Sequence, residues 1–90
     1  MKNTVTIENA KEWHVCSLIV QGLPTKLAQI KQALLAISLT EIYASDDQNG
    51  KIVVVMQSHN QRQLLQQIED ARNIDGVITV SLVYHQQDVE

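Results

Sequence analysis

The sequence predicts an α+β fold, in which two helices cover one face of a four-stranded antiparallel sheet. Apolar runs of strand length alternate with two amphipathic segments of helix length. They follow the order strand, helix, strand, strand, helix, strand, and two right-handed crossovers place both helices on the same face. This is the split βαβ, or ferredoxin-like, plan (βαββαβ), with the first and third strands in the centre of the sheet.

The first half of the chain supplies one strand and one helix. Residues 15–20 are apolar apart from Ser17, which is typical of a buried central strand, and Gly22 and Pro24 end it. Residues 25–37 are predicted to be helical, because apolar residues recur there at spacings of three and four: Leu27, Ile30, Leu34 and Ile37. We therefore expect the apolar side of this helix to pack against a sheet.

The second half supplies a hairpin, a helix and a closing strand. Residues 40–45 and 51–57 are predicted strands, and Asn49-Gly50 between them suits a tight hairpin turn. Ser58, with Gln61 three residues later, or Asn60 can cap the second helix. Its predicted apolar stripe is Leu64, Leu65, Ile68 and Ala71. Residues 76–87 form the last predicted strand.

Strand alternation divides the sheet into two faces, both of them apolar. The set predicted to meet the helices is Cys16, Leu18, Val20, Ile52, Val54, Met56, Ile78, Val80, Leu82 and Tyr84. The set predicted for the opposite, open face is Val15, Ser17, Ile19, Tyr43, Val53, Val55, Val77, Thr79, Ser81 and Val83. An exposed apolar patch of this kind marks an interaction site, and two copies stacked on it would form a weak homodimer.

Size and composition exclude several classes of protein. Ninety residues make one domain, predicted over residues 13–90 after a polar, flexible lead-in at residues 1–12. A net charge of -3 and only three aromatic residues argue against a nucleic-acid partner. The sequence shows no signal-peptide core and no apolar stretch of about 18 residues, so we expect neither secretion nor membrane insertion. A single cysteine is compatible with the cytosol.

No group of residues predicts catalysis or a bound cofactor. Strand parity places His14 and His85 on opposite faces, so a shared metal ion is not expected, and His59 lies at a helix start. Cys16 has the apolar neighbours of an inert core residue. The three glycines lie at turns and match no phosphate-binding loop. We therefore expect a protein that is not an enzyme and binds no metal.

Two segments carry a resemblance to a known family. They are residues 13–21, WHVCSLIVQ, and residues 72–87, RNIDGVITVSLVYHQQ. The chain from about Trp13 onward resembles the NapD family, small cytoplasmic assembly chaperones of the periplasmic nitrate reductase. The pairing of a Cys-Ser step in one strand with a Tyr-His step in the other is specific, because hydrophobic pattern alone would fix neither.

The resemblance implies a chaperone that binds the twin-arginine (Tat) signal peptide of the catalytic nitrate reductase precursor. Such a protein delays export of the precursor and supports its maturation with the molybdenum cofactor, without being an enzyme itself. The implied location is the cytoplasm. The signal-peptide-binding residues expected here are Val15, Ser17, Ile19, Tyr43, Val53, Val55, Thr79, Ser81 and Val83.

Two other interpretations remain at this point. A strand followed by Gly22-Leu23-Pro24 and a helix with Leu27 and Ile30 also resembles the start of ACT-type regulatory domains, which bind amino acids at that loop. The glycine-proline spacing is imperfect for that family, and the closing strand fits the chaperone better. A purely structural homodimer is the other alternative.

Overall fold

The computed structural model describes the backbone of residues 12–89 and the side chains of residues 13–83. Its elements are β1 (Glu12–Gly22), a 3₁₀ turn η1 (Pro24–Lys26), α2 (Leu27–Leu35), β2 (Thr40–Asp46), β3 (Lys51–Ser58), α3 (Gln61–Arg72) and β4 (Val77–Val89). The predicted lead-in lies outside the described residues apart from Glu12, which begins β1.

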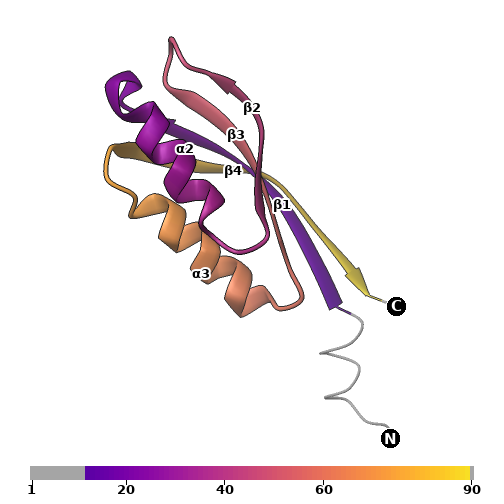
Figure 1. Ribbon diagram of the computed structural model, residues 1–90. Helices are drawn as coiled ribbons and strands as arrows, with labels where there is room; N and C mark the ends of the chain where they lie inside the picture. The colour runs from indigo at the N-terminus through magenta and orange to yellow at the C-terminus, as the bar shows by residue number, and fades with distance from the viewer. Residues whose placement is uncertain (1–11, 90) are drawn as a thin grey trace, which may run out of the picture.

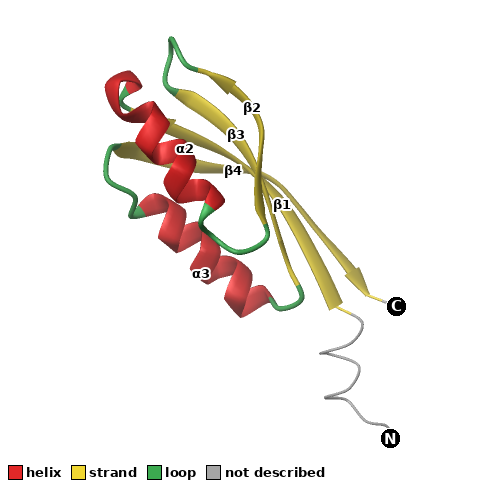
Figure 2. Cartoon of the chain, viewed as in Figure 1, coloured by secondary structure: helices red, strands yellow, loops and turns green. Residues whose placement is uncertain are grey.

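The four strands form one sheet in the order β2-β3-β1-β4, and all neighbours are antiparallel. Helices α2 and α3 lie side by side against one face of it (Figure 1). No helix or strand of residues 12–89 lies over the opposite face (Figure 2). The predicted ferredoxin-like α+β fold, with β1 and β3 in the centre, is confirmed.

Helix α2 covers the sheet with the stripe that its sequence predicts. Leu27, Ile30 and Leu34 are buried, and they lie at the spacings of three and four that align side chains on one helical face. The helix ends at Leu35, two residues before the predicted end, yet Ile37 still packs against the core. Pro24 begins η1, where the missing N–H of proline breaks no helical hydrogen bond.

Helix α3 is capped by Asn60, one of the two predicted candidates. The Asn60 side chain accepts a hydrogen bond from the backbone N–H of Gln63 at 3.1 Å, whereas the Ser58 hydroxyl donates to the Asn60 carbonyl. Leu64 and Ala71 are buried as predicted, and Ile68 is partly buried. Leu65, the other apolar residue of this helix noted in the sequence, is 58% exposed.

Gln67 takes a buried place in the α3 stripe, three residues after Leu64. Its Nε2 donates hydrogen bonds to the Ser38 carbonyl at 2.6 Å and to the Gln57 carbonyl at 3.3 Å. These bonds satisfy the amide nitrogen and offset part of the cost of removing a primary amide from water, because the buried Oε1 has no hydrogen-bond partner within the described residues. Because glutamine is usually exposed, the sequence alone did not indicate that Gln67 would be buried.

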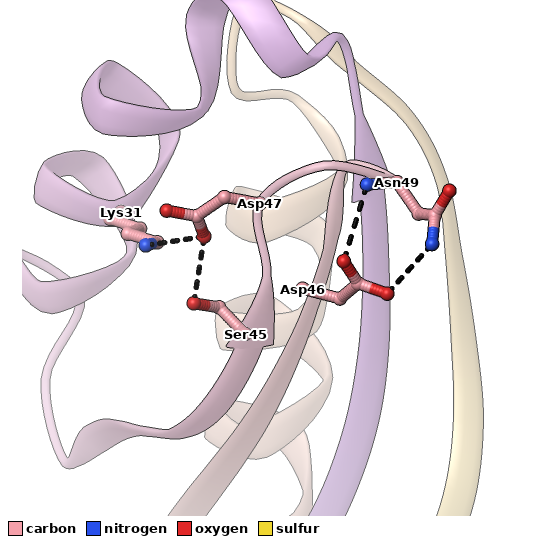
Figure 3. Close-up of polar contacts among 5 residues, drawn as sticks. All are labelled: Lys31, Ser45, Asp46, Asp47 and Asn49. Atoms are coloured by element: carbon pink, nitrogen blue, oxygen red, sulfur yellow. Dashed lines mark hydrogen bonds and ion pairs between the residues drawn. The ribbon is translucent and has the colours of Figure 1, made fainter.

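The β2–β3 connection is a four-residue loop, longer than the predicted tight turn. Asp46 pairs with Lys51 at its base, and the Asp46 carboxylate accepts hydrogen bonds from the backbone and side-chain nitrogens of Asn49 (Figure 3). Of Asn49 and Gly50, only Gly50 has a positive φ, at 71°. A Cβ at Gly50 would collide with the Gly22 carbonyl oxygen, so the loop closes tightly onto the end of β1.

The core lies between the helices and alternate residues of β1 and β3. Six residues predicted for this side are fully buried: Cys16, Leu18, Val20, Ile52, Val54 and Met56. On β4 the prediction was wrong for Ile78 and Leu82, which are 60% and 57% exposed. Val80 packs against the core but remains partly exposed.

A register shift between β1 and β4 explains the exposure of Ile78, and the edge position of β4 explains that of Leu82. Ile78 lies within the shift between the Gln21–Thr79 and Gly22–Val77 pairs. Leu82 does pair with buried Leu18, but β4 is an edge strand with a neighbour on one side only. A second shift occurs between the pairs made by Ser17 and Leu18. Strict alternation, which ignores these shifts, therefore assigns some residues of β4 to the wrong face of the sheet.

Parity also fails toward the C-terminal end of β4. Beyond the shift at Val83, Tyr84 pairs with Ser17, and His85 pairs with Cys16. Directly paired positions share a face of the sheet. The assignment of Tyr84 to the helix face, and of His85 to the face opposite His14, is therefore contradicted by the backbone register.

Candidate functional site

The candidate site is the face of the sheet that the helices leave uncovered. On β1 and β3, every second residue is buried against the helices, and the residues between them are partly exposed. We call the partly exposed set the open sheet face: Trp13, Val15, Ser17, Ile19 and Gln21 of β1, and Val53, Val55 and Gln57 of β3, with the positions of β2 and β4 that pair with them, Glu41, Ala44, Thr79 and Ser81.

Most residues predicted for this face are brought together by the strand register. Ser17 pairs with Val55, and Ile19 pairs with Val53 on one side and Ser81 on the other. Val15 pairs with Gln57 one step further along. Directly opposed side chains on one face have Cβ atoms about 5 Å apart, so these residues form a continuous surface. Its centre is aliphatic.

Three predicted residues stand apart from that centre. Tyr43 lies in a bulge of β2, between the Ile42–Val54 and Ala44–Val53 pairs, and is 79% exposed. Val83 lies in the β4 bulge and is 61% exposed. The prediction for Val77 was wrong, because Val77 pairs with Gly22 and packs against the hydrophobic core.

The open sheet face also contains residues that sequence reasoning missed. Trp13 has the parity of Val15, and its ring meets that of His59 edge to face, with centroids 4.4 Å apart. Glu41 pairs with Val55, which places a carboxylate at the β2 side of the aliphatic centre. Extending the alternation by two residues before Val15 would have found Trp13. Pairing the two strands of the hairpin would have found Glu41.

The histidine and the cysteine on β1 belong to the interior. His14 and Cys16 are fully buried on the helix side of the sheet. Burial raises the pKa of the Cys16 thiol, with a hydrogen bond from the Met56 backbone acting in the opposite direction. A neutral, inaccessible thiol is a poor nucleophile. Cys16 therefore acts as a small core residue.

A hollow lies in the helix layer, away from the open sheet face. Its volume is about 310 Å³, and it lies between the end of α2 and the exposed side of α3. Its lining residues are Ala36, Ile37, Ser38, Gln63, Gln66, Gln67 and Asp70. Neither α2 nor α3 has the length and apolar character that crossing a lipid bilayer requires, and they are the only α-helices in residues 12–89.

Comparison with known proteins identifies the family. The family model described as NapD protein matches residues 13–89. The chain is 58% identical to "Chaperone NapD" of Haemophilus influenzae over 89 residues, covering 98% of this chain and 96% of that protein. It is 42% identical to "Chaperone NapD" of Escherichia coli K12 over 76 residues, covering 84% of this chain and 87% of that protein.

A solved structure has the same fold. The solution structure described as the E. coli Tat proofreading chaperone protein NapD matches with a TM-score of 0.77 and 42% sequence identity. The match covers 82% of this chain and 78% of the solved chain. Family, sequence and fold agree with the resemblance carried by the first and last strands. The chain therefore belongs to the NapD family.

Proposed function

We propose that this protein is a cytoplasmic chaperone that binds the twin-arginine signal peptide of the periplasmic nitrate reductase precursor. The solved relative is described as a Tat proofreading chaperone, which supports a signal peptide as the ligand. The observation that carries the proposal is the open sheet face, where the central strands present aliphatic side chains that residues 12–89 leave without a covering element.

A twin-arginine leader has the chemistry that this face can accept. Its basic pair precedes an apolar stretch that can coil into a helix, and an amphipathic helix binds by laying its apolar side on an apolar surface. Val15, Ile19, Val53 and Val55 provide that surface. Ser17 and Ser81 lie among them and keep the empty face hydrated.

The energy available from this surface is moderate. Complete burial of an aliphatic side chain contributes about 1.5 to 3 kcal/mol. The open sheet face yields less per residue, because each of these side chains is already partly screened by its neighbours in the sheet. Association itself costs about 4 to 15 kcal/mol, so several contacts must act together. We therefore expect reversible binding, which a chaperone that later releases its client requires.

Sequestering the leader is sufficient for the proposed role. A leader held against the sheet is inaccessible to the export machinery, and this delays export while the precursor matures. The chaperone needs no bond-making step to do so. The fully buried Cys16 and His14 are consistent with a role based on binding alone.

The binding surface is tested by replacing a central valine with a neutral polar residue. Val55→Asn should weaken binding of a synthetic twin-arginine signal peptide of the nitrate reductase precursor about tenfold or more, because a carboxamide loses its hydration when the leader covers it. Asparagine adds no charge that could attract the arginines. Isothermal titration calorimetry measures the affinity, and amide chemical shifts confirm the fold.

Leu35→Asn is the matched control, because Leu35 is an exposed apolar residue on α2, in the helix layer. It should bind the peptide as the natural protein does. Equal losses in the two variants would contradict a site on the sheet. A leader from another Tat substrate, bound equally well, would contradict the proposed client. Sedimentation of the free protein would reveal any dimer that stacks two open sheet faces.

A further inference from the structure

Glu41 differs from the other acidic residues whose side chains are described. Five of the six have a partner: Asp46 with Asn49, Asp47 with Lys31, Glu69 with Arg72, Asp70 with Gln66 and Asp75 with Lys26. Glu41 has neither a hydrogen bond nor an ion pair within the described residues. Its carboxylate is therefore available to a ligand.

The position of Glu41 is the second observation. It pairs with Val55, so it lies on the open sheet face beside the aliphatic centre. Tyr43 follows two residues later on the same strand, in the bulge, with 79% of its surface exposed. A carboxylate on the face and an exposed aromatic residue in the adjacent bulge thus lie close together along β2, the strand at this edge of the sheet.

Two other charged residues, at the margin of this face, are poor alternatives. Asp46 and Lys51 pair at the hairpin end of the sheet. The Asp46 carboxylate is engaged by Asn49, and Lys51 would repel a cation. Glu41 is the acidic side chain on the described part of the face that a positively charged group can approach without displacing an internal contact.

We propose that Glu41 receives an arginine of the leader, with Tyr43 as a flanking aromatic surface. This inference rests on the proposed function. A guanidinium matches a carboxylate with two parallel hydrogen bonds, and its flat face stacks on aromatic rings. The basic end of the leader then lies at the β2 edge, and its apolar stretch lies across β3 and β1. The pair fixes the orientation of the leader on the sheet.

A charge-neutral substitution at Glu41, combined with altered peptides, tests the contact. Glu41→Gln should weaken binding of the twin-arginine peptide about tenfold. Against a peptide in which both arginines are glutamine, Glu41→Gln should change affinity less than twofold. Titration calorimetry of the natural protein and of Glu41→Gln with both peptides completes a double-mutant cycle. The coupling energy from this cycle isolates the contact between Glu41 and the arginines.

Glu69→Gln is the matched control. It removes one negative charge as Glu41→Gln does, but Glu69 lies on α3 in an exposed ion pair with Arg72. It should bind the twin-arginine peptide within twofold of the natural protein. Tyr43→Phe should retain affinity and Tyr43→Ala should lose part of it, because stacking requires the ring and not the hydroxyl.

The outcomes separate this inference from the function on which it rests. If the natural protein does not bind the peptide, the proposed function is overturned, and this inference with it. If it binds, but Glu41→Gln and Glu69→Gln behave alike, the role of Glu41 alone is overturned. Equal loss with both peptides would also overturn it, because the carboxylate would then act on something other than arginine.

Discussion

Asp47 and Glu41 show how different roles arise for carboxylates within one hairpin. The Asp47 carboxylate accepts hydrogen bonds from the Lys31 ammonium and the Ser45 hydroxyl, both at 2.8 Å, and ties the β2–β3 loop to α2 (Figure 3). Glu41, on the same strand as Ser45, has no internal partner within the described residues. One carboxylate is committed to the fold, and the other remains available for binding.

The pKa of Asp47 provides a test at this scale. The hydrogen bond from Lys31, followed by that from Ser45, lowers the pKa of the Asp47 carboxyl below its ordinary value of 3.8. The contribution of Asp47 to stability is therefore fully present above about pH 3.8 and is lost as the pH falls through the lowered value. Carboxyl chemical shifts followed from pH 6 to pH 2 measure the midpoint directly.

Lys31→Gln should move that midpoint upward, toward the ordinary value, because it removes the charged donor. Lys51→Gln removes the same charge from the other end of the loop and is the control, since Lys51 makes no contact with Asp47 within the described residues. An Asp47 midpoint that Lys31→Gln leaves unchanged would show that the ion pair does not persist in solution.

The sequence predicts the helices and strands themselves better than it predicts how the strands pair. Order, type and approximate bounds of all six main elements follow from the spacing of apolar residues, because burying one face requires that spacing. The bulges at Tyr43 and Val83 do not follow from it. Neither position is a glycine or proline, and a bulge reflects how two strands fit together rather than what either strand contains.

Unpredicted bulges also limit how much of the candidate site the sequence predicts. The division of β1 and β3 into a buried and a partly exposed face was predicted correctly, because those two strands pair without a shift from His14 to Gln21. The margins of the site on β2 and β4 were not, because both edge strands contain register shifts. Val77 was misplaced by a shift, and Glu41 was overlooked because an isolated acidic residue on an edge strand is usually only a solvated side chain.

Mutation of Gln67 tests how α3 is held to the sheet. Gln67 joins α3 to the segment before β2 and to the end of β3, through carbonyls at Ser38 and Gln57. Gln67→Ala removes both hydrogen bonds, while the Ser38 carbonyl still accepts one from the Thr40 hydroxyl, and losing two such bonds costs about 1 to 3 kcal/mol in total. We expect the free energy of unfolding to fall by about that amount in urea denaturation.

Gln63→Ala is the control, because Gln63 is an exposed residue one turn earlier on α3. Its side chain donates no hydrogen bond within the described residues, and the substitution should change stability by less than about 0.5 kcal/mol. If Gln67→Ala were equally mild, the Gln67 amide would not be holding α3 to the sheet.

The two faces of the sheet differ in what covers them. The helix face buries an aliphatic core, and the open sheet face leaves aliphatic and hydroxyl side chains partly or fully exposed. Within residues 12–89, helices α2 and α3 cover one face of the sheet (Figure 1). Aliphatic residues beyond those that the helices cover make up the centre of the open sheet face, which is the surface proposed to bind the leader.

Net charge gives a prediction about the molecule as a whole. The chain has a formal net charge of -3 at pH 7, and a twin-arginine leader is positively charged at its basic end. Attraction between them accelerates encounter, and salt screens it over a Debye length of about 10 Å at 0.1 M. Raising NaCl from about 50 to 500 mM should therefore slow association severalfold, while dissociation changes less.

Stopped-flow fluorescence with a labelled leader measures both rates. The leader with glutamine in place of both arginines should associate more slowly at low salt and show little salt dependence, because the remaining interaction is apolar. If the twin-arginine leader associated equally fast across this range, long-range charge would play no part in its capture. Apolar contact with Val15, Ile19, Val53 and Val55 would then have to account for recognition from the first encounter.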